Sequence, residues 1–333
     1  MRIGVAGVGR IGRFHAETLR GLPAVESVIV ADADQERARL TAAALSVEAA
    51  GSPDALLTAG LDALVIAAAT DAHPDLIVRG LDAGLPVFCE KPVASDIGAT
   101  LTVLKRAAGA GPPVQIGFQR RFDPGYLAAR AAVQSGRLGW LHTVRATTLD
   151  PAPPPAAYIA TSGGLFRDCG VHDFDAIRWV TGREIVAVYA TGANRGADFF
   201  RAAGDVDTMS ALLTLDDGTL ATVSSGRYNG AGYDVRLEVL GSAGSICAGL
   251  DDSLPLPSAE PGVAFPAGPP CPQFFARFAD AYRSELAAFI GIAADRGPSP
   301  CPIEDALAAS CVADACELSR ARRAPVLVEE VRP

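Results

Sequence analysis

The sequence has no long apolar run and no excess of positive charge. No stretch of its 333 residues approaches the roughly 20 apolar residues that a membrane helix needs, so we expect no membrane-spanning segment. Arg10 and Arg13 interrupt the apolar N-terminal run, a pattern that does not fit a signal peptide. The formal net charge of -9 argues against nucleic acid or an anionic membrane as the main partner, because both are densely negative. We therefore expect a cytoplasmic protein that acts on small molecules.

Paired cysteines and histidine clusters are also missing. The seven cysteines are odd in number and widely scattered, and no two of them have the spacing of a zinc site. We therefore expect reduced and mostly buried thiols. The four histidines are far apart and lack a carboxylate-histidine ligand pattern, so we expect no metal. They are His15, His73, His142 and His172.

The first 120 residues alternate strand and helix patterns. Near-continuous apolar segments are followed by segments in which apolar residues recur with helical spacing. The expected strands cover residues 2–8, 25–34, 61–70, 86–92 and 113–118, and the expected helices cover 11–22, 35–45, 73–84 and a segment that ends at Ala107. This alternation predicts a doubly wound parallel sheet covered on both faces, a Rossmann domain, over residues 1–120.

The pattern changes from about Arg121. Period-two apolar runs joined by tight turns, such as Asp216-Asp217-Gly218, predict a large, mostly antiparallel open sheet. The expected elements are strand runs over 143–149, 184–193, 208–227 and 234–249, helices over 164–180, 274–295 and 302–321, and a final strand over 325–331. Seven prolines between Leu254 and Gln273 predict a loop. We assign residues 121–333 to a second α/β domain, so the fold class is α/β.

The segment GVGRIG indicates a dinucleotide site. Its glycines Gly7, Gly9 and Gly12 follow a strand and open a helix, and an acid, Asp32, ends the second strand about 20 residues after Gly12. In this fingerprint the glycines permit a tight turn, the approach of a pyrophosphate to a helix N-terminus, and close packing of helix on strand. Arg10 and Ile11 lie within the turn and are predicted to contact the cofactor.

Asp32 favours NAD over NADP. Its carboxylate would accept hydrogen bonds from the ribose hydroxyls and would repel a 2′-phosphate. The alternative reading of Asp32 is an exposed carboxylate that opens a turn.

Two further polar stretches follow strands of the first domain, where α/β sheets bind ligands. Thr70 and His73 follow the third strand, and Glu90 and Lys91 follow the fourth. We predict that these four side chains lie beside the cofactor. Pro92 restricts the lysine before it to an extended backbone, which would present the amine at the mouth of the sheet.

The ordered set of motifs resembles one enzyme family. VAGVGRIG, Asp32, ATDAH, CEKP, GFQRRFDP and GGLFRDCGVHDFDAIRW together resemble the glucose-fructose oxidoreductase/inositol dehydrogenase (Gfo/Idh/MocA) family across nearly the whole chain. The resemblance implies NAD as cofactor and a homo-oligomer, a dimer or tetramer, assembled through the open sheet of the second domain. It also implies that Lys91, Asp168 and His172 are catalytic.

The chemistry implied by the resemblance is oxidation of a secondary alcohol. His172 would take the hydroxyl proton as general base, while Lys91 would orient the hydroxyl and stabilise the developing alkoxide. Asp168 and His172 are four residues apart, a spacing that places both on one helix face. Asp168 would hold the substrate and the histidine. Asp175 would face the pocket or pair with Arg178 or Arg121.

The implied substrate is a cyclic polyol or sugar, with myo-inositol as first choice. Arg121, Asp150, Tyr228, Tyr233 and Tyr282 are further candidates for contact with it, although Arg121 could also neutralise a nearby carboxylate and each tyrosine could simply pack. The segment from Asp150 to Pro155 departs from the family pattern. The alternatives are a dehydrogenase of another sugar or amino-sugar alcohol, an NAD-dependent glycoside hydrolase, and a non-catalytic NAD-binding sensor.

Overall fold

The computed structural model describes residues 1–332, which divide into two compact units. The first unit contains Met1–Gln119 and Asp280–Leu307, and the second contains Arg120–Ala279 and the segment from Ala308 onward. The first division lies beside the boundary expected near residue 120. Asp280–Leu307, which the sequence placed in the second domain, groups with the first unit instead.

The first unit contains a parallel sheet of six strands in the order β3-β2-β1-β4-β5-β6. The strands are β1 (Arg2–Ala6), β2 (Ser27–Ala31), β3 (Glu48–Ala49), β4 (Ala63–Ile66), β5 (Val87–Glu90) and β6 (Val114–Gly117). In the central strand β1, Val5 pairs with Val30 of β2 on one side and Val65 of β4 on the other. Strands buried on both faces explain the near-continuous apolar runs of the sequence. The order is that of a Rossmann fold.

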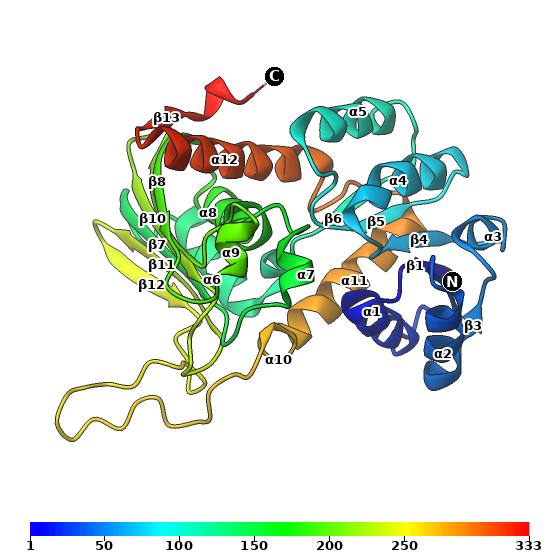
Figure 1. The fold of residues 1–333 in the computed structure, drawn as a ribbon, viewed down its shortest axis with the longest axis horizontal. Coiled ribbons are helices and arrows are strands. Elements are labelled where there is room, and N and C mark those ends of the chain that lie inside the picture. The colour runs from blue at the N-terminus through cyan, green and yellow to red at the C-terminus, as the bar shows by residue number, and fades with distance from the viewer. Residues whose placement is uncertain (333) are drawn as a thin grey trace. The chain divides into compact units, whose positions relative to one another are not determined.

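Helices cover both faces of this sheet (Figure 1). They are α1 (Arg10–Arg20), α2 (Gln35–Leu45), α3 (Pro53–Leu57), α4 (His73–Asp82), α5 (Ile97–Ala107) and α11 (Ala279–Asp295). Leu19 of α1, Leu45 of α2 and Phe289 of α11 share one buried cluster with Val5 and Val30 of the sheet. On the other face, a Cβ on Gly80 of α4 would lie 2.9 Å from the Val87 side chain, so the glycine lets α4 pack closely on β5.

The second unit contains a mixed sheet of seven strands in the order β12-β11-β7-β10-β9-β8-β13. The strands are β7 (Leu141–Leu149), β8 (Ile185–Ala193), β9 (Thr208–Leu215), β10 (Leu220–Gly226), β11 (Asp234–Gly241), β12 (Gly244–Ala248) and β13 (Val326–Leu327). The pairing of β7 with β10 is parallel and the other pairings are antiparallel. Buried and exposed residues alternate along β9, so this sheet has one covered and one open face.

The remaining helices are α6 (Pro124–Gln134), α7 (Ala156–Ile159), α8 (Val171–Thr181), α9 (Phe199–Ala202), α10 (Phe274–Arg277) and α12 (Ile303–Arg322). Helices α6 and α8 pack on each other and contact the sheet (Figure 1). The proline-rich segment after β12 is a loop with no regular element before α10. Within residues 1–332, every helix is too short or too polar to span a bilayer.

The predicted α/β fold with a parallel and a mostly antiparallel sheet is confirmed, but two local predictions are wrong and a third misses a detail. The helix expected over 274–295 is interrupted at Phe278, whose ring is buried beneath the guanidinium of Arg277 at 4.6 Å. The final strand is limited to β13, because the chain turns so that the Glu330 carboxylate accepts a hydrogen bond from the Leu327 N–H at 2.9 Å. The helix expected over 164–180 is present, and it contains a π-helical turn over Phe166–Gly170 that was not predicted.

Candidate active site

The glycine-rich turn lies between β1 and α1. Gly7 has a φ of +90°, and a Cβ there would lie 2.5 Å from the Cα of Ala68. A Cβ on Gly12 would lie 1.9 Å from the carbonyl oxygen of Gly7. A Cβ on Gly9, by contrast, would meet nothing within 4 Å. The turn therefore leaves open space at the N-terminus of α1, which Arg10 and Ile11 begin, and this space fits a dinucleotide pyrophosphate.

Asp32 follows β2 and is held beside the same turn. Its carboxylate accepts hydrogen bonds from the Val8 N–H at 2.8 Å and the Asp34 N–H at 2.9 Å. Nη1 of Arg37 lies 3.4 Å from it. Only 7% of Asp32 is exposed, so its negative charge is fixed at the edge of the glycine turn.

The loops after β4 and β5 are joined by His73. Its Nδ1 lies 2.7 Å from the carbonyl oxygen of Pro92, and its Nε2 lies 3.1 Å from that of Ala68. Thr70 begins the short 3₁₀ turn that precedes this histidine. The buried imidazole therefore fixes the loop after β4 against the segment that carries Lys91.

Lys91 comes directly after β5 and is half-buried, and its peptide bond to Pro92 is cis. The preceding residue, Glu90, is buried and its Oε1 lies 2.6 Å from Nε2 of His15 on α1. Sequence analysis had assigned no role to His15 beyond excluding a metal site. The pair links the helix that begins at the glycine turn to the residue next to Lys91.

The Tyr282 ring packs in the first unit. It lies on α11, is 4% exposed, and makes edge contacts with the rings of Phe14 at 5.4 Å and His15 at 5.8 Å. These contacts match the packing alternative for Tyr282. A contact with substrate stays a prediction.

In the second unit, Asp168 and His172 lie on one continuous helix that runs from Leu165 to Thr181. The N–H of Leu165 donates to the Asp205 carboxylate at 2.8 Å, which fixes the start of this helix. Asp168 lies in the π-helical turn and is 9% exposed, and His172 is half-buried at the start of α8. Single π-helical turns inside α-helices are frequent at functional sites.

Helix α8 also carries two buried ion pairs. Arg121 makes two bonds to Asp175, at 2.9 and 2.5 Å, and Arg120 bonds Asp173 at 2.5 Å. Burial raises the pKa of Asp173, and Arg120 opposes that increase. Asp175 thus has Arg121 as its partner, whereas Arg178 pairs with Glu184 at 2.7 Å. A contact between Arg121 and substrate stays a prediction.

Both oxygens of the Asp168 carboxylate are engaged. Nη2 of Arg227 lies 2.5 Å from Oδ2, and Oη of Tyr158 donates to Oδ1 at 2.8 Å. Nη1 of the same guanidinium lies 2.9 Å from Oδ2 of Asp150. The structure therefore brings two predicted residues, Asp150 and Asp168, to one buried cation that the sequence analysis missed.

The two tyrosines predicted after β10 have different environments. Tyr233 is 7% exposed, and burial raises its pKa well above the usual value against the opposing effect of Arg120. Asp150 adds to that increase, so Tyr233 shares the electrostatic environment of the candidate site. Tyr228 is 47% exposed, and its hydroxyl accepts a hydrogen bond from the Ala197 N–H at 3.1 Å.

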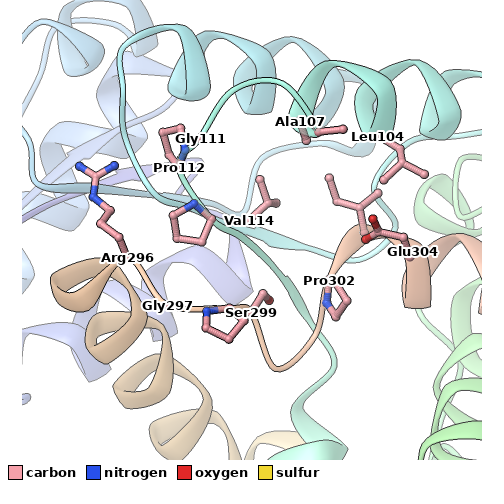
Figure 2. A pocket seen from close by; sticks show the side chains of 14 residues that line it. Leu104, Ala107, Gly111, Pro112, Val114, Arg296, Gly297, Ser299, Pro302 and Glu304 are labelled. Carbon is pink, nitrogen blue, oxygen red and sulfur yellow. The ribbon is translucent and has the colours of Figure 1, made fainter.

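A cavity of about 320 Å³ lies elsewhere in the first unit (Figure 2). It is formed by the end of α5, the segment before β6 and the connection between α11 and α12, with Leu104, Val114, Arg296 and Glu304 among its lining residues. None of the residues described as lining it is a predicted site residue. Among residues 1–332, no group of three or more His, Cys, Asp and Glu side chains is arranged to hold a metal ion.

A Rossmann unit with this glycine turn, together with a unit carrying an Asp–His helix, defines a class of nicotinamide-dependent oxidoreductases. The chain belongs to the Gfo/Idh/MocA family. The family model for the oxidoreductase family with an NAD-binding Rossmann fold matches residues 1–118, and the model for the GFO/IDH/MocA C-terminal domain matches residues 126–247. The resemblance inferred from the motifs and the prediction of NAD as cofactor are thereby confirmed.

Similar proteins carry inositol dehydrogenase names. Myo-inositol dehydrogenase Hyg17 of Streptomyces leeuwenhoekii is 41% identical over 303 residues, which cover 90% of each chain. Inositol 2-dehydrogenase of Rhizobium meliloti (strain 1021) is 37% identical over 329 residues, 98% of this chain and 99% of the relative. The crystal structure of scyllo-inositol dehydrogenase from Lactobacillus casei, with NAD(H) and scyllo-inositol bound, has a TM-score of 0.89 at 31% identity and 99% coverage of both chains.

Proposed function

We propose that this protein is an NAD-dependent dehydrogenase that oxidises a secondary alcohol of a cyclic polyol, with myo-inositol as the first substrate to test. The observation that carries the proposal is the Asp168 carboxylate, fixed on both oxygens by Arg227 and Tyr158, one helical turn before His172. The inositol dehydrogenase names of full-length relatives support the same substrate class.

Three side chains have assigned roles in this proposal. His172 takes the hydroxyl proton of the substrate as general base, a role worth ~10²–10⁴ in rate. The Lys91 ammonium donates to the same oxygen and stabilises the negative charge that develops there. Asp168 orients the imidazole and the polyol. Bound NAD supplies the acceptor for the hydride that leaves the carbinol carbon, so the products are a ketone, NADH and the proton held by His172.

The residues that would hold the cofactor belong to the first unit. The open space at Gly9 would hold the pyrophosphate at the N-terminus of α1, next to Arg10 and Ile11. Asp32 accepts hydrogen bonds from the adenosine ribose. Thr70, His73 and Glu90 shape the loops next to Lys91.

A substrate panel tests the proposal. Inositol isomers, sugars and amino-sugar alcohols are assayed with NAD and with NADP in parallel, and NADH formation is followed by absorbance. We expect the highest kcat/KM for an inositol with NAD. A higher value for a sugar or an amino-sugar alcohol would replace the substrate, and the absence of NADH formation with every alcohol would contradict the dehydrogenase activity.

We also propose a homo-oligomer, a dimer or tetramer, that assembles through the open face of the second sheet. Tyr189 of β8, Leu212 of β9 and Leu220 of β10 are each nearly half-exposed, and the register places Tyr189 opposite Leu212. Such an exposed apolar surface on a sheet suits an interface. Light scattering after size exclusion should show an oligomer that Leu212→Glu dissociates. A monomeric wild-type protein would contradict the proposal.

A reducing compartment such as the cytoplasm suits this chain. All seven cysteines are free, and five of them are buried. Burial raises the pKa of the Cys89 and Cys316 thiols, which keeps them protonated and unreactive. Full activity of the protein in the presence of a thiol reductant is the expected result.

A further inference from the structure

Arg227 and Asp150 meet because two parallel strands end together. In the register of β7 with β10, Leu149 pairs with Gly226, and Asp150 and Arg227 are the next residues of the two strands. The N–H of Asp150 donates to the Gly226 carbonyl at 2.9 Å, which continues the pairing past the strand ends. The sheet therefore fixes the backbone positions of the acid and the base.

The guanidinium of Arg227 connects this sheet edge to the π-helical turn. Nη1 lies 2.9 Å from Oδ2 of Asp150 and 3.0 Å from Sγ of Cys169, and Nη2 lies 2.5 Å from Oδ2 of Asp168. The Arg227 side chain is 2% exposed. A planar fork of donors is suited to bridging two carboxylates in this way, whereas a lysine ammonium is a single compact charge.

Arg227 is the buried cation that balances these two carboxylates. Burial lowers the pKa of Arg227, but Cys169, Asp168 and Asp150 raise it by more, so the net shift is upward and the guanidinium stays charged. Without the cation, two negative groups would share a largely desolvated site. Such groups repel each other and lose their fixed orientation.

We propose that Arg227 is a positioning residue for the oxidation: it holds Asp168 and Asp150 in the orientation in which they act on the polyol and on His172. This inference rests on the proposed dehydrogenase function. Tyr158 assists by fixing the second oxygen of Asp168, and it follows the segment from Asp150 to Pro155 that sequence analysis found to depart from the family pattern.

The test compares Arg227→Ala and Arg227→Lys with Arg178→Met as a matched control. Arg178 is also a mostly buried arginine of the second unit with a paired carboxylate, Glu184, so its loss should affect stability without affecting turnover. We expect Arg227→Ala to lower kcat/KM for the polyol by about 100-fold, because small displacements of catalytic groups have effects of that size. The dissociation constant of NAD, measured by fluorescence titration, should not change. Arg227→Lys keeps the charge but not the fork, and should be intermediate.

Two further readouts separate positioning from a general structural effect. Added guanidinium ions should restore turnover to Arg227→Ala in a saturable manner, whereas sodium chloride at the same ionic strength should not. In a double-mutant cycle with Asp168→Asn, the double variant should lose less activity than the two single losses combined, because Arg227 acts in part through that carboxylate. If Arg227→Ala does not fold, the same comparison is made with Arg227→Lys.

Several results would overturn the proposal. Near-normal turnover of Arg227→Ala or Arg227→Lys would do so, as would an equal loss in Arg178→Met or additive losses with Asp168→Asn. These outcomes presuppose an active wild-type protein. A wild-type protein that oxidises no polyol would instead defeat the proposed function itself, so the two failures are distinguishable.

Discussion

Replacing His15 by phenylalanine should destabilise the first unit. His15 and Glu90 form a pair at 2.6 Å in which the side chains are 0% and 10% exposed. The surroundings of the imidazole are aromatic, with the rings of Phe88 at 5.5 Å and Tyr282 at 5.8 Å. Phenylalanine would keep those ring contacts and remove the N–H that faces the carboxylate, so the variant isolates the polar interaction.

The expected loss is that of a buried hydrogen bond whose carboxylate partner stays behind. Leaving a buried polar group without its partner costs about 1–3 kcal/mol. At roughly 2–4 °C per kcal/mol for a domain of this size, the melting temperature should fall by about 5 °C. Urea unfolding followed by circular dichroism and thermal scans both measure this change.

Two variants serve as controls for His15→Phe. The double variant His15→Phe/Glu90→Gln should recover part of the loss, because it removes the uncompensated charge. Glu36→Gln breaks the exposed pair of Glu36 with Arg39 and should leave the midpoint unchanged, since surface pairs contribute little. An unfolding midpoint of His15→Phe equal to that of the wild type would refute the reasoning.

The remaining predictions concern one residue each. His172→Ala should lower kcat by ~10²–10⁴ while fluorescence titration gives an unchanged NAD affinity; near-normal turnover would remove the histidine from its role. Asp32→Ser should raise kcat/KM with NADP relative to NAD, and an unchanged ratio would count against the contact with ribose. Burial raises the pKa of Tyr126 from 10.0 to about 12, with Arg120 opposing, so the tyrosine stabilises the fold below pH 10 and this contribution is lost as the pH rises toward 12. In urea titrations Tyr126→Phe should therefore lose less stability than the wild type over this interval; parallel curves would contradict the assignment.

Most of the fold could be predicted from the sequence, because the apolar period of a helix, about 3.6 residues, differs clearly from that of a half-buried strand, about two. It could not predict which sheet a helix packs on, since helical spacing shows an apolar face but not its partner. Leu286 and Phe289 illustrate this limit: they join the core of the first unit although they come after strands β7 to β12 of the second. The π-helical turn also escaped notice, because it covers only Phe166–Gly170 and is too short to give an apolar period of its own.

A site residue could be predicted where the strand directly before it shows its position. It was missed where its position depends on a bonding partner far away in the sequence. Asp32 and Lys91 follow strands directly, and parallel sheets place such residues at one edge. Arg227 escaped notice because its partner Asp150 comes from a strand 77 residues earlier, and the period-two pattern did not reveal that β7 and β10 run parallel. His15, on α1, was missed because its partner Glu90 lies 75 residues later, at the end of β5.

A crystal structure with NAD and myo-inositol bound would test the central claim most directly. The quantity to measure is the distance from Nζ of Lys91, and from the nearer imidazole nitrogen of His172, to the hydroxyl oxygen on the carbon that faces the nicotinamide. We predict that both nitrogens lie within about 2.6–3.2 Å of that single oxygen. A structure in which the two side chains contact different hydroxyl groups, or line separate cavities, would contradict the account.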